Sequence, residues 1–165
     1  LFRSLVGFIG EGAKGRREAT TRLLNQAFPK VRHLMDVVGT VTVRVPTADL
    51  LAAVKRVSLV AERNTPLRML IEDEHIALEA ATGDQAHASE AIEAQVDVVG
   101  EEKSIEAAGF NPHYLLDALG ALDAPYAHFS FTAPGKPCLI TGLATIDGDQ
   151  LFDYRHVIML MRLPS

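Results

Sequence analysis

Short apolar runs, broken by glycine, proline and polar turns, recur along the chain and predict strands more often than helices. Residues 5–9 and 19–24 form two such runs, and the glycine-rich stretch at residues 10–15 between them is typical of a hairpin loop. Two strands alone cannot bury a face. We therefore expect residues 1–35 to be the C-terminal end of an upstream domain plus a linker, and residues 36–165 to form the next domain.

Two segments have the periodicity of amphipathic helices. The first opens at Pro46-Thr47, where Thr47 is the expected N-cap. Its buried stripe consists of Leu50, Val54, Val57 and Ala61. The second helix opens at Asn111, with asparagine as the N-cap and Pro112 at the first helical position.

The rest of the pattern predicts strands separated by short turns. These strands lie at residues 38–45, 67–71, 76–80, 88–99, 103–108, 127–131, 137–141 and 154–163. A flexible loop is expected at residues 142–152. The order strand, helix and three strands therefore occurs twice, as a β-α-β-β-β unit repeated in pattern but not in sequence. The predicted fold class is α+β, with antiparallel sheets and both helices on one face.

Composition narrows the class of protein. Apolar residues make up 48% of the chain and charged residues 22%, which permits a substantial core and excludes general disorder. The formal charge is −5, so any contact with nucleic acid must come from a local basic patch. No apolar stretch approaches the length of a membrane span, and the start has no features of a signal peptide. We expect a soluble, cytoplasmic protein.

No motif predicts catalysis, a metal site or a cofactor. The G-x-G-x-x-G match at residues 10–15 is not followed by the helix that a dinucleotide site needs. Cys138 lies within a predicted strand, which favours a packed core thiol over a nucleophile. The acidic turn at residues 72–75 could hold a cation weakly, although a solvated turn is favoured. The turn at residues 147–149 lacks the remaining ligands of a calcium loop.

Two surface features suggest binding instead. On the first helix, Lys55, Arg56 and Arg63 share a face that otherwise carries small residues. Such a face suits close passage of a polyanion without sequence readout, although an ordinary solvated helix is the alternative. Leu59 and Val60 form an apolar pair near the end of this helix and are a candidate protein contact.

The second feature is the C-terminal run at residues 157–163, which is apolar in both alternation classes. A central core strand explains this pattern. The alternative is an adaptable peptide groove, because methionines such as Met159 and Met161 suit surfaces that repack around different ligands.

These residues together resemble a known family, the bacterial β sliding clamp of DNA polymerase III. FNPHYLLDAL at residues 110–119 is similar to its F-N-x-x-Y-L-x-D-x-L signature, and MLMRL at residues 159–163 is similar to its M-P-M-R-L terminus. Residues 21–24 and 28–30 resemble the junction between its second and third domains.

The resemblance implies a DNA-clamp fold and a non-catalytic processivity factor without cofactor or metal. Two chains of three domains each would form a head-to-tail homodimer around duplex DNA, with the helices lining the hole. Lys55, Arg56 and Arg63 would face the DNA, and Leu59 and Val60 would lie at the dimer interface. The partners implied are the polymerase III alpha subunit, the clamp loader delta subunit, other polymerases and repair proteins, all in the nucleoid-associated cytoplasm of a bacterium.

The resemblance also implies a hydrophobic groove that docks short linear motifs of these partners. Carried over by position, the groove residues are Pro29, His33, Leu34, Asn111, Tyr114, Gly135, Pro137, Val157, Ile158, Met159, Leu160, Met161, Arg162 and Leu163. Leu160 stands where the family usually has proline, and His33 where arginine is common. The alternatives are a specialised, inhibitor-tolerant copy of the clamp, a peptide-binding adaptor that forms no ring, and an enzyme built around Cys138.

Overall fold

The computed structural model describes residues 4–13, 15–61, 65–82, 86–100 and 105–163, and divides the chain into two compact units. The first unit, residues 1–30, contains one antiparallel hairpin. Its strands are β1 (Leu5–Gly12) and β2 (Gly15–Arg22). Both strands are longer at the turn than the sequence pattern predicts, because pairing continues until Gly12 lies opposite Gly15. Gly15 has a φ of 93°, a conformation that glycine adopts without strain.

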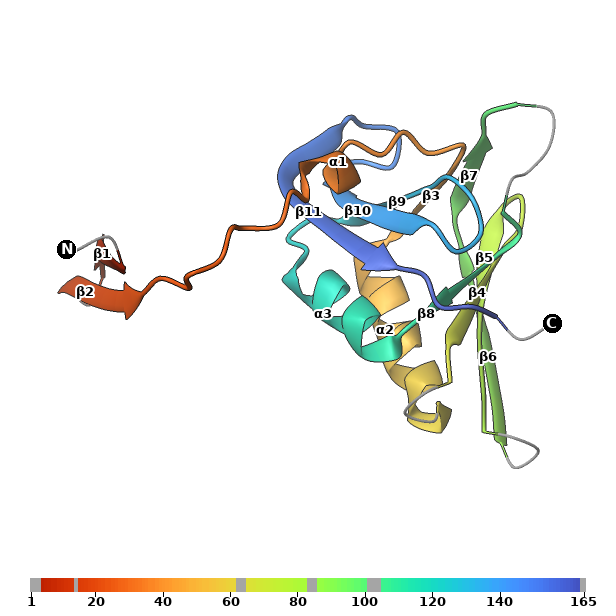
Figure 1. Ribbon diagram of the computed structural model, residues 1–165. Helices are drawn as coiled ribbons and strands as arrows, with labels where there is room; N and C mark the ends of the chain where they lie inside the picture. The colour runs from red at the N-terminus through yellow and green to blue at the C-terminus, as the bar shows by residue number, and fades with distance from the viewer. Residues whose placement is uncertain (1–3, 14, 62–64, 83–85, 101–104, 164–165) are drawn as a thin grey trace. The chain divides into compact units, whose positions relative to one another are not determined.

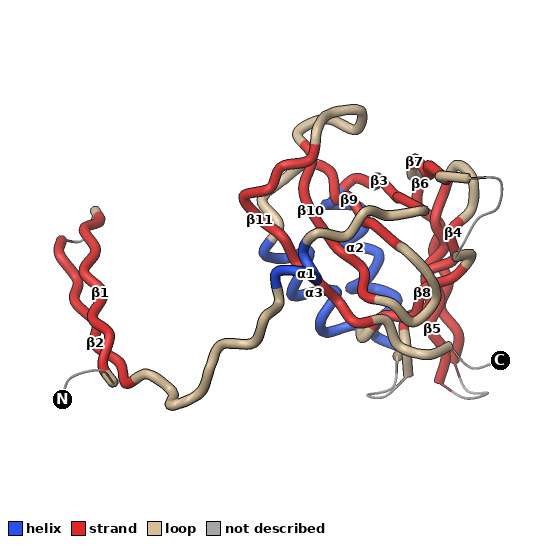
Figure 2. Tube along the Cα trace, turned by 45° about the horizontal axis from the view of Figure 1, so that its top comes forward, coloured by secondary structure: helices blue, strands red, loops and turns tan. Residues whose placement is uncertain are grey.

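The second unit, residues 31–165, contains two antiparallel sheets (Figures 1 and 2). The five-stranded sheet has the order β11-β10-β9-β3-β7, and the four-stranded sheet has the order β6-β5-β4-β8. The strands of the first are β3 (Val41–Pro46), β7 (Gln95–Val98), β9 (Tyr126–Phe131), β10 (Pro137–Leu143) and β11 (Gln150–Met159). Those of the second are β4 (Leu67–Ile71), β5 (His75–Thr82), β6 (Ala86–Glu93) and β8 (Ala107–Phe110).

The helices in this unit are α1 (Arg32–Met35), α2 (Thr47–Val57) and α3 (Pro112–Ala121), and a 3-10 turn, η1 (Ser58–Val60), follows α2. The order β3-α2-β4-β5-β6 is matched by β8-α3-β9-β10-β11, so the predicted β-α-β-β-β repeat and the α+β class are confirmed. The two halves exchange their first strands, because β3 pairs with β9 and β8 pairs with β4. Helices α2 and α3 pack against each other beside the two sheets (Figure 1).

The single strand predicted at residues 88–99 is wrong. The structure has two strands there, β6 paired with β5 and β7 paired with β3, so the chain passes from one sheet to the other at Ala94. Ala94 is buried, and its N–H donates to Glu74 O at 3.1 Å. Local alternation cannot reveal this transfer, since both pieces are extended and only their partners differ.

Thr47 is not the N-cap of α2. The helix starts at Thr47 itself, and Pro46 in extended conformation occupies the N-cap position without a side-chain hydrogen bond. The Thr47 N–H donates to Pro125 O at 2.9 Å. A backbone carbonyl of the neighbouring loop therefore satisfies one of the first N–H groups of the helix, which have no acceptor within the helix. The helix also ends earlier than expected, at Val57, so Ala61 lies beyond it. Arg63, which was expected on the same helix, lies outside the described residues.

Other elements also differ from the prediction. The last strand, β11, covers residues 150–159 rather than 154–163, so the loop before it is shorter. It is an edge strand, which makes the interpretation as a central core strand wrong. Strand β8 starts at Ala107, later than the predicted residue 103. Helix α1 was not predicted, because four residues within a linker carry no periodic signal.

Three phenylalanine rings join the two sheets in the core. Phe110 of β8 lies 6.1 Å from Phe129 and 6.4 Å from Phe131 between ring centroids, both edge-to-face. Phe129 and Phe131 of β9 stack on each other at 6.1 Å. All three rings are almost completely buried, so β8 is fixed against the five-stranded sheet by the packing that aromatic pairs prefer.

Asn111 is confirmed as the N-cap of α3. Its Oδ1 accepts hydrogen bonds from the His113 N–H at 3.0 Å and the Tyr114 N–H at 3.4 Å. We expect Asn111→Ala to lower the free energy of unfolding by about 1 kcal/mol, because two donors of the first turn lose their acceptor. Asn111→Asp, which keeps the acceptor, is the control. Urea unfolding monitored by circular dichroism measures both, and equal stability of the alanine variant and the wild type would contradict the assignment.

Candidate functional site

The C-terminal segment, residues 160–163, connects the two sheets. After β11 ends at Met159, the chain leaves the five-stranded sheet and meets the free edge of β8. The Met161 N–H donates to Gly109 O at 2.8 Å in an isolated antiparallel bridge. The segment therefore adds one pair to the four-stranded sheet, beside the core strand that carries Phe110.

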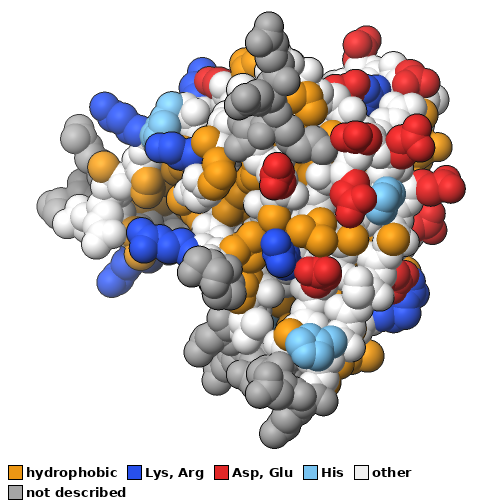
Figure 3. Space-filling view, turned by 90° about the vertical axis from the view of Figure 1, so that its right-hand side faces the viewer, with side chains coloured by type: hydrophobic (Ala, Val, Ile, Leu, Met, Phe, Trp, Pro, Cys, Tyr) orange, Lys and Arg blue, Asp and Glu red, His pale blue; other side chains and the backbone are white. Residues whose placement is uncertain are grey.

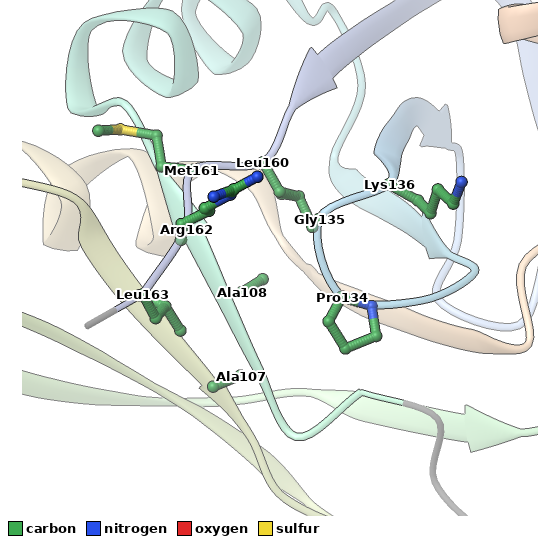
Figure 4. A pocket seen from close by; sticks show the side chains of 10 residues that line it. Ala107, Ala108, Pro134, Gly135, Lys136, Leu160, Met161, Arg162 and Leu163 are labelled. Atoms are coloured by element: carbon green, nitrogen blue, oxygen red, sulfur yellow. The ribbon is translucent and has the colours of Figure 1, made fainter. Parts of the chain in front are cut away.

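A cavity of about 600 Å³ lies beside this segment (Figure 4). Strand β8 forms one wall, the C-terminal segment a second and the turn before β10 a third. The lining residues are Ala107, Ala108, Gly109, Pro134, Gly135, Lys136, Leu160, Met161, Arg162 and Leu163. Among the described residues, the wall is apolar with two cations, Lys136 and Arg162, and no acidic side chain lines it. An extended peptide with apolar and acidic side chains suits such a surface better than a compact polar metabolite.

The cavity brings together part of the expected groove. Gly135 and the four residues of the C-terminal segment line it, and Gly135 has a φ of 70°, which suits glycine at this turn. Pro137 and Met159 pair across β10 and β11 just beyond it. Val157 is half-buried on β11, and Ile158 is buried in the core, where its side chain cannot meet a ligand.

The other expected groove residues do not line this cavity. Leu34 is half-buried on α1, which packs against β10 and β11, while His33 on the same helix is exposed. Tyr114 is 60% exposed in the first turn of α3. Pro29 is exposed in the first unit. Their part in a peptide groove stays a prediction.

The basic face of α2 is less positive than the sequence suggests. Lys55 is exposed, but Arg56 forms an ion pair with Glu90 of β6, with the Arg56 Nε donating to Glu90 Oε2 at 3.0 Å. The hydrogen bond to Arg56 lowers the pKa of Glu90, and the same bond raises the pKa of Arg56. Of the two cations on α2, Arg56 is therefore paired, whereas Lys55 has no ion pair among the described residues.

Leu59 and Val60 have different environments although they are adjacent. Leu59 is 84% exposed, whereas Val60 is half-buried and packs against the hydrophobic core. A leucine exposed on a short 3-10 turn leaves most of its apolar surface in water, which is unfavourable. Leu59 is therefore the stronger candidate for a contact with another protein.

On the side of the molecule that carries the four-stranded sheet, acidic side chains gather in one part of the face, beside apolar side chains and a few lysines and arginines (Figure 3). A cavity of about 690 Å³ at one end is lined by the acidic turn after β4 and by Glu106. Within this turn, His75 Nε2 lies 3.1 Å from Glu72 Oε2. No group of three or more candidate metal ligands occurs among the described residues. Among the described residues, no helix combines the length and the apolar character that crossing a membrane requires.

Cys138 and His128 have environments that oppose catalysis. Cys138 is fully buried in β10, and burial raises the pKa of its thiol well above the usual range, so the reactive thiolate is disfavoured. Burial, with a smaller contribution from the nearby Arg44 guanidinium, lowers the pKa of His128 to about 4. The imidazole is therefore neutral at physiological pH. The thiol and the imidazole belong to the packed sheet.

Sequence reasoning missed half of the cavity wall. Ala107, Ala108 and Gly109 are small residues without chemical character, and their importance comes from their place on a free sheet edge. Lys136 was also missed, because a single lysine in a turn resembles any solvated cation. One signal was present in the sequence: Gly109, directly before the F-N signature. A glycine within a strand can mark a place where another backbone segment approaches closely.

Comparisons with known proteins give the family. The family described as "DNA polymerase III beta subunit, C-terminal domain" matches residues 29–162. The β sliding clamp of Streptomyces coelicolor is 42% identical over 96% of this chain, and the "Beta sliding clamp homolog GriR" of Streptomyces muensis is 35% identical over 90% of it. The chain spans 40% and 38% of the lengths of these two relatives.

A solved structure confirms the fold. The DNA polymerase III beta subunit of Thermotoga maritima superposes with a TM-score of 0.77 over 98% of this chain and 40% of that one, at 22% sequence identity. The predicted clamp fold is thus confirmed by structure, and the resemblance in residues 110–119 and 159–163 is confirmed by the family match. This chain belongs to the β sliding clamp family of DNA polymerase III.

Proposed function

We propose that this chain is the C-terminal part of a processivity clamp that encircles duplex DNA as a homodimer and docks partner proteins through a peptide groove. The observation that carries the proposal is the family match over residues 29–162, combined with a cavity walled by the C-terminal segment. The clamp would act in the bacterial cytoplasm at the nucleoid, without catalysis of its own. The hairpin of residues 1–30 would be the end of the preceding clamp domain.

The charge distribution supports DNA on the helix side. The acidic side chains that gather in one part of the face shown in Figure 3 would repel phosphates there. Lys55 is exposed on α2. Arg63, the third cation of the predicted DNA-facing set, lies outside the described residues. A weak local field of this kind holds DNA loosely, which suits sliding without sequence preference.

The cavity supports the docking of short peptides. Its open, mainly apolar wall can take one or two apolar side chains, and Lys136 and Arg162 can pair with acidic residues of the ligand. An interface of this size buries little area, so each partner would bind reversibly and exchange with others. The polymerase alpha subunit, the loader delta subunit, other polymerases and repair proteins are the partners that we propose for this site.

A specialised, inhibitor-tolerant copy of the clamp is the second candidate. It is favoured by Leu160, which lines the cavity where the family usually has proline, and by the similarity to a clamp homologue designated GriR. Leucine restores a backbone N–H and the rotation that proline removes, so the wall of the cavity can differ from that of a typical clamp. The peptide-binding adaptor has no specific observation in its favour.

Lys55→Glu tests the DNA-facing surface. We expect the variant, in a chain with the full length of its relatives, to load less efficiently and to leave nicked circular DNA faster, because it replaces a phosphate contact with repulsion. In a plot of log retention against log salt concentration, the slope should become shallower by about one. Glu90→Gln is the matched control, since it frees Arg56 and should not weaken retention. Equal retention of Lys55→Glu and wild type at all salt concentrations would refute the assignment.

Leu59→Lys tests the dimer interface. The side chain is 84% exposed, so we expect unchanged thermal stability within the chain but loss of the dimer, because a charge would be buried at the contact. Val38→Lys is the control, since Val38 is 86% exposed in the same unit. Sedimentation velocity of full-length chains measures the outcome. A Leu59→Lys protein that sediments as a dimer would show that the interface lies elsewhere.

Removal of Met161 to Ser165 tests the groove. We expect labelled clamp-binding peptide to lose affinity by at least a hundredfold, because the truncation deletes one wall of the cavity, while the dimer still assembles. Removal of Pro164 and Ser165 alone is the control. Leu160→Pro should also change the affinity, since it fixes the backbone at the start of the segment. Fluorescence anisotropy measures all four proteins, and equal affinity of the long truncation and wild type would contradict the groove assignment.

A further inference from the structure

Gly109 lies under the C-terminal segment at the point where the segment meets β8. Its carbonyl accepts the Met161 N–H at 2.8 Å, which is the isolated bridge between the segment and the four-stranded sheet. A Cβ atom on Gly109 would lie 2.7 Å from Met161 O and 3.0 Å from Leu163 Cδ2. The first of these contacts is with backbone, so it can be relieved only if the segment moves away from β8.

The need for glycine here is a matter of space. Gly109 is not among the glycines with positive φ, so its backbone conformation is open to any residue. Its two neighbours in β8, Ala108 and Phe110, point their side chains into the core, and strand alternation turns residue 109 to the outer face. On that face a Cβ atom would meet the segment, since Met161 O and Leu163 Cδ2 lie within 3.0 Å of its position. The cost of a side chain at this position therefore falls on the segment and not on the fold of β8.

The position of the segment determines the shape of two cavities. Leu163 lines the cavity of about 600 Å³ beside β8 and also a second cavity of about 300 Å³ on the outer face of the four-stranded sheet. The second cavity has Pro66 and Ala81 among its lining residues. A shift of the segment away from β8 would carry the Leu163 side chain with it and change both cavities together.

We propose that Gly109 is a positioning residue of the peptide-binding site: by having no side chain, it lets the C-terminal segment pair with β8 and so places the wall that a docked peptide contacts. The inference rests on the proposed peptide-docking function and deepens it. Gly109 itself touches no ligand in this account. It acts through Met161 and Leu163, whose position it allows.

Gly109→Ala tests the proposal, with Gly120→Ala as a matched control. Gly120 lies on the exposed face of α3, and a Cβ atom there would meet no atom within 4 Å. Fluorescence anisotropy with a labelled clamp-binding peptide should show at least a tenfold loss of affinity for Gly109→Ala and none for Gly120→Ala. Amide hydrogen exchange at Met161, without peptide, should be slow in wild type and at least tenfold faster in Gly109→Ala.

The same substitution in the chain truncated before Met161 separates positioning from folding. The atoms that the new methyl group would meet are absent there, so Gly109→Ala should leave the melting temperature of the truncated chain unchanged. A large drop in that background would place the role of Gly109 in β8 itself and overturn the proposal. Wild-type affinity of Gly109→Ala in the intact chain would overturn it as well. Failure of the wild-type chain to bind any clamp-binding peptide would instead overturn the proposed function on which it rests.

Discussion

The burial of Phe110 between the two sheets is the constraint on which the rest of the second unit depends. Its ring meets Phe129 and Phe131 edge-to-face, so a strand of one sheet is anchored against a strand of the other. Edge-to-face contacts fix orientation as well as distance, because the ring edges and faces carry opposite partial charges. The anchored strand therefore has a defined face toward solvent and a defined end toward α3.

Two features of the site follow from this anchor through the geometry of an extended chain. Because Phe110 points inward, Gly109 points outward and meets the C-terminal segment. Because β8 ends at Phe110, Asn111 stands at the start of α3, where its side chain accepts two hydrogen bonds from the first turn. Tyr114 is thereby placed in that turn with most of its side chain exposed. One buried ring thus links the cavity wall to the helix that bears the tyrosine.

The sequence was sufficient where local chemistry decides the structure. The start of α3 and the repeated order of elements were predictable, because a capping asparagine and alternating apolar residues act within a few positions. The division of residues 88–99 between two sheets was not, since it depends on which strands lie on either side of Ala94. The cavity wall at Ala107 and Gly109 was missed for the same reason. The pairing of Arg56 with Glu90 also joins residues far apart in sequence.

The candidate site lies where the two halves of the internal repeat differ in their pairing. In the first half, the chain that leaves β6 continues as β7 and pairs with β3 over four residues, from Val41 to Arg44. In the second half, the chain that leaves β11 also crosses toward β8, and its described residues, up to Leu163, form one bridge there, at Met161. A longer ladder would cover more of the edge of β8. With one pair among the described residues, the edge of β8 and the C-terminal segment instead form two walls of the cavity. The same crossing between sheets therefore closes the edge of β3 in the first half and borders a cavity in the second.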